Sequence, residues 1–141
     1  MEELLHYVWK HKLFALKPLQ TTDGQPIEII DPGLANMHAG PDFFNAKIKI
    51  NDVTWVGNIE IHQQASDWFR HNHHLDPAYD SVILHVASDI DATPTRSNGA
   101  VIPQMELHYP PYLLKNYEEL IRADRYPACF RIIPQLPSLL L

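Results

Sequence analysis

The sequence predicts a mixed fold of the α+β or α/β class in a chain of 141 residues. Apolar residues recur at helical spacing near both ends, and they alternate at strand spacing in the middle. One nearly continuous apolar run is typical of a buried strand. The predicted order is helix, three strands, short helix, buried strand, with an added hairpin and a C-terminal helix. We divide the chain into an α/β core over 1–109 and a C-terminal helix and tail over 110–141.

The first helix is predicted over residues 2–14. Its apolar face is formed by Leu4, Leu5, Val8, Trp9 and Leu13. The acidic pair at its start and the lysines near its end suit the helix dipole. A turn follows, and then a short strand over 27–30 that ends at a Pro-Gly turn. We expect a polar loop from there to Gly40-Pro41.

The next two strands, 43–50 and 53–62, predict an antiparallel hairpin that turns at Asn51-Asp52. Together with 27–30 they form a three-stranded antiparallel meander. Because side chains alternate along a strand, Glu60 and His62 share one face of the second hairpin strand, and Ile59 and Ile61 share the other.

The remaining elements carry clearer local signals. Ser66 and Asp67 are typical of the start of a short helix through His71, and a polar loop follows over 72–80. A buried strand is predicted over 81–87 and a hairpin at Asn98-Gly99. A second amphipathic helix is predicted over 111–124. The apolar run 136–141 predicts a chain that leads into a missing region.

The net charge of −6 is unevenly distributed. Residues 51–100 contain seven acids, only two basic residues (Arg70 and Arg96) and five of the nine histidines. Carboxylates with imidazoles indicate a metal site or a proton-transfer site. The same composition argues against a generic DNA-binding module, which needs clustered lysine and arginine.

Compartment is predicted from what the sequence lacks. The single cysteine, Cys129, excludes a disulfide framework and a four-cysteine zinc site. The N-terminus is acidic where a secretory signal would be basic, and no apolar run approaches the ~20 residues of a membrane helix. We therefore expect a cytoplasmic protein that does not enter a membrane.

Two acidic motifs lie on the predicted hairpin: Gly40-Pro41-Asp42 at its start and Glu60-Ile61-His62 at its end. The hairpin would bring both carboxylates to one edge. Two carboxylates ~4 Å apart repel by about 4 kcal/mol at an effective dielectric constant of 20, so a shared site favours a cation. Hard oxygen ligands of this kind suit Mg²⁺ or Mn²⁺.

These motifs, on this order of elements, resemble the PD-(D/E)XK nucleases of restriction-endonuclease-like fold. The resemblance implies that Asp42 and Glu60, with the carbonyl of Ile61, bind Mg²⁺ or Mn²⁺, and that the domain hydrolyses phosphodiesters in nucleic acid. His62 stands where that superfamily has lysine, so it would activate or orient water. Lys47 or Lys49, one strand away, would contact phosphate in place of the missing lysine.

A second resemblance covers nearly the whole chain. It is carried by these stretches: 5–13 (LHYVWKHKL), 21–30 (TTDGQPIEII), 39–50 (AGPDFFNAKIKI), 57–62 (GNIEIH), 66–68, 71–73 (HNH), 78–86 (AYDSVILHV) and 102–103. They resemble a bacterial family of unknown function whose members are considerably longer. This resemblance implies that the chain is the N-terminal part of such a protein.

Two other functions stay open at the level of sequence. Few basic residues and the missing motif lysine favour a catalytically inactive interaction module, whose apolar tail would dock on a protein partner. Alternatively, His62, His85 and a histidine of the cluster His71, His73 and His74 converge on Zn²⁺. The interpretation that assigns no function to these histidines is a solvated polar loop beside one core histidine, His85.

Overall fold

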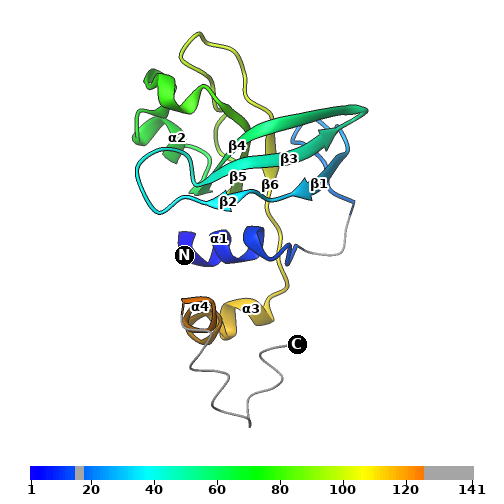
Figure 1. Ribbon diagram of the computed structural model, residues 1–141, viewed down its shortest axis with the longest axis vertical. Coiled ribbons are helices and arrows are strands. Elements are labelled where there is room, and N and C mark those ends of the chain that lie inside the picture. Colours follow the sequence, from blue (N-terminus) through cyan, green and yellow to red (C-terminus); the bar gives the residue numbers. More distant parts are fainter. Residues whose placement is uncertain (15–17, 126–141) are drawn as a thin grey trace.

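A six-stranded mixed sheet organises the chain, and the class is α+β (Figure 1). The computed structural model describes residues 1–14 and 18–125. The strands are β1 (Ile27–Asp31), β2 (Leu34–Ala35), β3 (Phe43–Ile50), β4 (Val53–Gln64), β5 (Val82–Asp89) and β6 (Gln104–Glu106). The helices are α1 (Glu2–Lys10), α2 (Asp67–Arg70), α3 (Tyr112–Lys115) and α4 (Tyr117–Arg125), with two 3₁₀ turns, η1 (His73–Leu75) and η2 (Pro77–Tyr79).

The sheet combines an antiparallel half with a parallel half. Strands β1, β3 and β4 form the predicted antiparallel meander, and the short strand β2 also pairs with β3. Strand β5 runs parallel to β4, and β6 runs parallel to β5. Because parallel neighbours need a crossover, the chain between β4 and β5 leaves the sheet and carries α2, η1 and η2.

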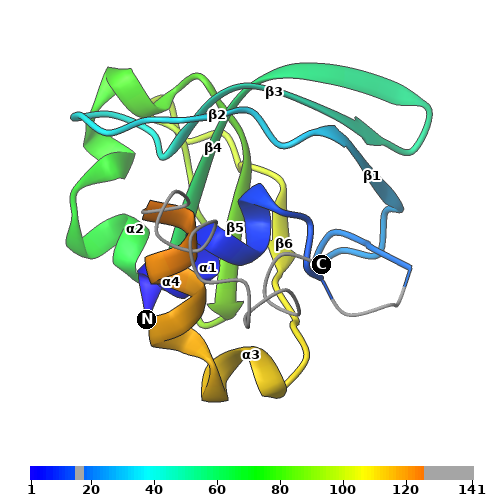
Figure 2. The same cartoon turned by 60° about the horizontal axis from the view of Figure 1, so that its bottom comes forward.

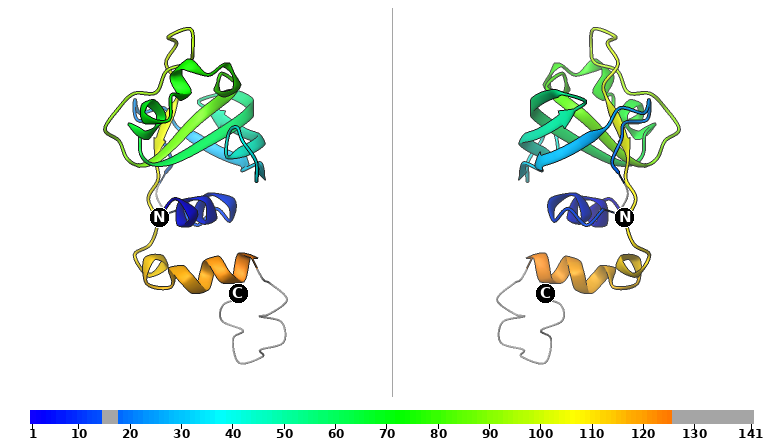
Figure 3. Two further views of the ribbon diagram at one scale, coloured as in Figure 1. Left: turned by 90° about the vertical axis from the view of Figure 1, so that its left-hand side faces the viewer. Right: turned by 90° about the vertical axis from the view of Figure 1, so that its right-hand side faces the viewer.

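Helix α1 covers one face of the sheet, and α3 and α4 cover α1 from outside (Figures 2 and 3). An apolar core lies where helix and sheet meet: Leu4, Leu5, Val8 and Trp9 pack with Ile48, Ile59, Ile61, Leu84 and Val86. Burial of each such side chain stabilises the fold by about 1.5–3 kcal/mol. Asp124 of α4 contacts Lys10, the last residue of α1, at 3.2 Å and the next residue, His11, at 2.9 Å.

The opposite face of the sheet is different, because much of what it buries is polar. A small apolar cluster of Trp68, Val82 and Ile102 lies there. Beside it are the buried polar side chains Glu60, His62, His73, His85 and Gln104. We call this the polar face, and α2, η1 and η2 lie over it (Figure 1).

A bulge in β5 decides which of its side chains reach the polar face. Asn58 pairs with Val82 but Ile59 pairs with Leu84, so Ile83 is an extra residue in β5. The bulge places Val82 in the cluster with Trp68, while Leu84 joins the core against α1. Because one residue shifts the alternation, His85 then faces the same side as Val82.

Local predictions fail at four places. The predicted first helix ends at Lys10, because Lys12 adopts a left-handed backbone (φ 53°). The predicted polar loop before Gly40 contains β2. The Asn98-Gly99 turn joins a single bridge instead of two strands, and the predicted second helix is interrupted at Asn116.

Some predictions concern residues outside the described part of the chain. Cys129 and the apolar run 136–141 are among them. Within the described residues, no helix combines the length and the apolar character needed to cross a membrane.

Gly33 fixes the approach of the chain to the bulged start of β3. It has φ +92°, and a Cβ there would lie 2.6 Å from the backbone oxygen of Phe44. Gly24 has nearly the same backbone (φ +88°) with open space around it. Gly24→Ala should therefore lower the free energy of unfolding by about 1 kcal/mol through backbone strain alone. Gly33→Ala should lower it by about 1–3 kcal/mol more, because backbone must move.

Urea unfolding of the two variants measures this difference. Equal losses for Gly33→Ala and Gly24→Ala would show that the contact with Phe44 does not restrain the chain.

Candidate functional site

Asp42 lies where the pairing of β3 with β4 ends. Phe43 and Ile59 are the last paired residues between β3 and β4, so the backbone N–H groups that follow in β4 need other acceptors on this side. The N–H of Ile61 donates to Oδ2 of Asp42 at 2.8 Å, and the N–H of Asp42 donates to Oε1 of Glu60 at 3.1 Å. The hairpin thus joins both acids at one edge, as the sequence predicts.

Glu60 is the centre of the polar cluster. It is 4% exposed, and its Oε2 lies 3.2 Å from Nε2 of His62 and 2.9 Å from Nε2 of His73. His62 comes from the same face of β4, whereas His73 comes from η1 in the crossover. One carboxyl therefore contacts two imidazoles and the backbone N–H of Asp42.

His71 completes a group of three imidazoles. His62, His71 and His73 each offer one ring nitrogen, and these nitrogens all lie within 4.8 Å of one another. Asn72, between the two loop histidines, has a left-handed backbone (φ 59°), which asparagine tolerates better than most residues. His71 is exposed, while His62 and His73 are buried.

A chain of hydrogen bonds runs from His62 into the protein. Its Nδ1 lies 2.8 Å from Nε2 of His85, and Nδ1 of His85 lies 2.7 Å from Oε1 of Gln104. The amide of Gln104 donates to the carbonyl of Ala92 at 3.0 Å. His85 is therefore a hydrogen-bonded core histidine behind His62, and it does not join the three imidazoles.

Burial and neighbouring charge set the protonation of the two acids. Burial, with the charge of Asp42 next, raises the pKa of Glu60 to about 10. Burial also acts to raise the pKa of Asp42, but hydrogen bonds and charge from His6 and the Ile61 amide outweigh it and lower the pKa below its usual range. At neutral pH Glu60 is thus a neutral acid beside a charged Asp42.

Burial also keeps the imidazoles of His62, His73 and His85 neutral. Burial lowers the pKa of His62 to about 3 and the pKa of His73 and His85 to about 4. A neutral imidazole has a free lone pair, which is the form that binds a metal ion. The cluster therefore combines metal-ligand chemistry with a buried acidic proton.

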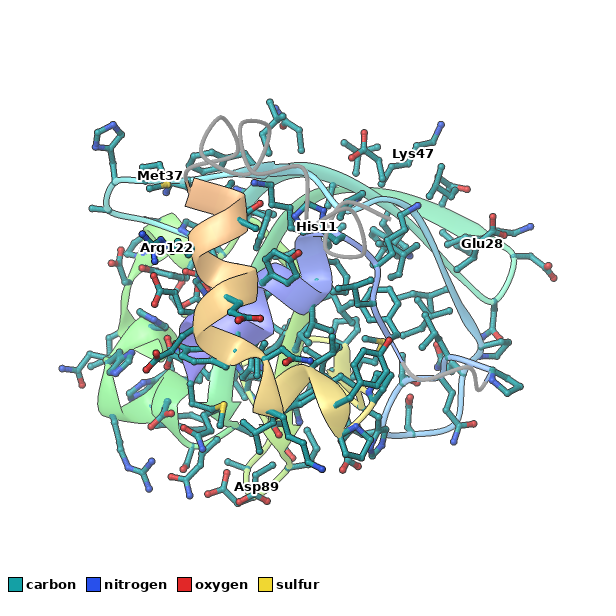
Figure 4. The ribbon with its side chains drawn as sticks, turned by 90° about the horizontal axis from the view of Figure 1, so that it is seen from below. His11, Glu28, Met37, Lys47, Asp89 and Arg122 are labelled. Atoms are coloured by element: carbon teal, nitrogen blue, oxygen red, sulfur yellow. The ribbon has the colours of Figure 1, made fainter. Side chains whose placement is uncertain are left out.

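The predicted site residues are only partly brought together. Asp42, Glu60, Ile61 and His62 meet at the edge of β4. Lys47 and Lys49 lie further along the hairpin and outside the cluster, where Lys47 is opposite Asp31 and Lys49 is opposite Glu28. Figure 4 shows Lys47 and Glu28 on the side of the molecule away from α2.

Three further residues of the site have no local signal in the sequence. His6 of α1 places Nε2 3.4 Å from Oδ2 of Asp42. Tyr79 stacks on His73 with ring centroids 3.7 Å apart, and Gln104 holds His85. All three reach the site through tertiary packing, so only the arrangement of helices and strands identifies them.

The chain belongs to a family described as "Protein of unknown function (DUF2851)", whose model matches residues 2–141. This confirms the resemblance to an uncharacterised family. No curated protein and no solved structure matches the chain.

We expect the stability of the metal-free protein to fall below about pH 6.5. His62, His73 and His85 are neutral when folded and bind protons when unfolded, and each proton contributes about 1.4 kcal/mol per pH unit. Glu60 acts oppositely, because unfolding releases its proton above about pH 4.5. The net slope near pH 5.5 should be about 3 kcal/mol per pH unit, and stability should decline again above pH 7.

Urea unfolding with a chelator between pH 4.5 and 8 measures this profile. Glu60→Gln should remove the decline above pH 7, whereas His108→Gln, at an exposed position, should leave the profile unchanged. A stability maximum below pH 5 would contradict the assignment of neutral imidazoles.

Proposed function

We propose that this member of a family of unknown function binds one divalent transition-metal ion on the polar face and uses it for hydrolysis. The ligands would be the carboxylate of Glu60 and the imidazoles of His62, His71 and His73. The observation that carries the proposal is the convergence of these groups: Oε2 of Glu60 is 2.9 and 3.2 Å from two imidazole nitrogens, and three ring nitrogens lie within 4.8 Å.

The electrostatics of the cluster support a cation. Glu60 is buried beside the charged Asp42 and keeps its proton only because it has no stronger partner. A divalent ion would displace that proton, and it would meet imidazoles that are already neutral. Ion binding would therefore give the buried Glu60 carboxylate a cation in place of its proton, and the sheet would not need to rearrange.

The ligand set indicates which ions would bind. Imidazole suits Zn²⁺, Mn²⁺ and Fe²⁺ better than Mg²⁺, which prefers oxygen ligands. Exposure of His71 leaves one side of the cluster open to solvent, where water and a substrate can enter. An ion in such an open site lowers the pKa of a bound water and offsets charge on a phosphoryl group.

Phosphodiesters are the substrate class that we propose, on two grounds. The order of elements and the pair Asp42 and Glu60 resemble PD-(D/E)XK nucleases. In addition, Asp42 lies beside Glu60, with His6 next to it. In the proposed reaction Asp42 would be a proton acceptor, with the imidazole of His6 beside it.

His73→Ala should weaken binding of Zn²⁺ and of Mn²⁺ by about 100-fold or more, because it removes a ligand and not merely a supporting contact. His108→Ala is the matched control, since this histidine is exposed and lies outside the cluster. Calorimetric titration of the chelated and dialysed protein measures both. Equal affinity in His73→Ala and wild type would contradict the site.

A second candidate follows the predicted arrangement more closely. In it, Asp42 and Glu60, with the carbonyl of Ile61, bind Mg²⁺ or Mn²⁺ for cleavage of nucleic acid. The observation that favours it is that the backbone of this edge joins the two acids: the N–H of Asp42 donates to Oε1 of Glu60, and the N–H of Ile61 donates to Oδ2 of Asp42. A hard cation would suit two carboxylates that lie this close together. His62 contacts the same Glu60, so it would be positioned to take a proton from water.

Two variants separate the candidates. If the imidazole site is correct, Asp42→Asn should leave Zn²⁺ affinity within about tenfold of wild type, because Asp42 is not a ligand in it. If the two-carboxylate site is correct, Asp42→Asn should abolish Mg²⁺ binding and His73→Ala should not. Calorimetry with each ion distinguishes these outcomes. Hydrolysis of single-stranded and double-stranded DNA and RNA by the Mn²⁺-loaded protein, with Glu60→Gln as control, then tests the substrate class.

A further inference from the structure

We infer that His85 and Gln104 are positioning residues that fix the tautomer of His62, so that its Nε2 lone pair faces the metal ligands. The inference deepens the proposed function and rests on it, because it concerns how one proposed ligand is held. Neither residue is a proposed ligand: His85 contacts the ligand His62, and Gln104 contacts His85. They act through the hydrogen-bonded chain Ala92, Gln104, His85 and His62, which we call the relay.

The carbonyl of Ala92, at the inner end of the relay, fixes which group donates in each of its hydrogen bonds. The carbonyl of Ala92 can only accept, so the atom of Gln104 that lies 3.0 Å from it must be the NH₂ group. The other atom of that amide, Oε1, then faces Nδ1 of His85 at 2.7 Å. Because Oε1 can only accept, Nδ1 of His85 must carry the hydrogen.

The same logic passes to the next ring. A neutral imidazole has one N–H, so Nε2 of His85 is a lone pair. It lies 2.8 Å from Nδ1 of His62, which must therefore donate. The remaining nitrogen of His62, Nε2, is left as a lone pair, and it lies 3.2 Å from Oε2 of Glu60. One backbone carbonyl thus determines which nitrogen of His62 is free.

The sheet holds the relay rigidly. His85 of β5 is opposite Glu60 in β4 and opposite Gln104 in β6, so three members of the relay, His62, His85 and Gln104, lie on three adjacent strands. Both histidines are fully buried, and the edge of Trp68 packs against His85 with ring centroids 5.3 Å apart. Groups on paired strands are placed more precisely than groups on loops, as a metal ligand requires.

The relay also keeps the ligand uncharged. Metal-bound histidines commonly donate their second N–H to a carboxylate or a carbonyl. Here the acceptor is another imidazole, and the relay ends in an amide and a carbonyl without any carboxylate. Among the four proposed ligands, only Glu60 would then bring a charge to the ion.

The tautomers are measured without any metal. Long-range ¹H–¹⁵N NMR of the metal-free chain at pH 7 should show that His62 and His85 both carry the hydrogen on Nδ1. A hydrogen on Nε2 of either ring would overturn the inference. This result does not depend on whether the protein binds an ion.

The functional part is tested by two substitutions at one position. His85→Phe removes the acceptor of His62 Nδ1–H, and it should weaken Zn²⁺ binding by about 10–100-fold and spread His62 over both tautomers. His85→Gln retains an acceptor for the Nδ1–H of His62, because the introduced amide can accept from His62 and donate to Gln104. Its Zn²⁺ affinity should stay within about threefold of wild type, and His62 should keep its hydrogen on Nδ1.

The outcomes distinguish the positioning role of His85 from the proposed metal site. Equal Zn²⁺ affinities for His85→Phe and His85→Gln, with both variants folded by circular dichroism, would overturn the positioning role. Wild-type protein that binds neither Zn²⁺ nor Mn²⁺ would overturn the proposed function, and the NMR result would still decide whether the relay has the inferred direction. If His85→Phe does not fold, Gln104→Leu removes the inner half of the relay and should produce the same loss of affinity.

Discussion

A carboxyl group buried beside a second carboxylate and two imidazoles must hold either a proton or a cation, and Glu60 is in this position. Other features of the polar face follow from that requirement. The imidazoles around Glu60 are neutral and present lone pairs, and Asp42 keeps its charge through separate partners, the Ile61 amide and His6. The proton on Glu60 is therefore the group of this cluster that an ion would replace most easily.

The sheet creates this position at the point where its pairing changes. Strand β4 continues past the last pair with β3, and Asp42 supplies the missing acceptor on that edge. On the other edge β4 pairs in parallel with β5, so the crossover must pass over the polar face and delivers His71 and His73 there. The bulge at Ile83 turns His85 to the same side. Acids and imidazoles from distant parts of the sequence thus meet because β4 pairs antiparallel with β3 on one side and parallel with β5 on the other.

The part of the site that follows from short-range rules could be predicted from the sequence. Alternation places Glu60 and His62 on one face, and a hairpin returns the second acid to Asp42. Residues brought by tertiary packing could not be predicted: His6 depends on where α1 packs, and Gln104 on the register of a three-residue strand. The segment 72–80 has a polar composition typical of a solvated loop, yet it buries His73, because Tyr79 of the same segment stacks on the imidazole and Trp68 of α2 packs against it.

His62 stands at the position where the PD-(D/E)XK nucleases that these motifs resemble have lysine, and a histidine there changes the chemistry that the resemblance implies. A lysine would bring a fixed positive charge to the two acids, whereas the relay gives His62 a free lone pair and no charge. In the described part of the chain, no lysine or arginine forms an ion pair with Glu60 or Asp42, and Lys47 and Lys49 face acids of β1 instead. In the proposed site, a bound ion would supply the positive charge that Glu60 lacks. In the proposed site this arrangement would favour a metal with affinity for nitrogen, because His62 would be a ligand and not a source of fixed positive charge.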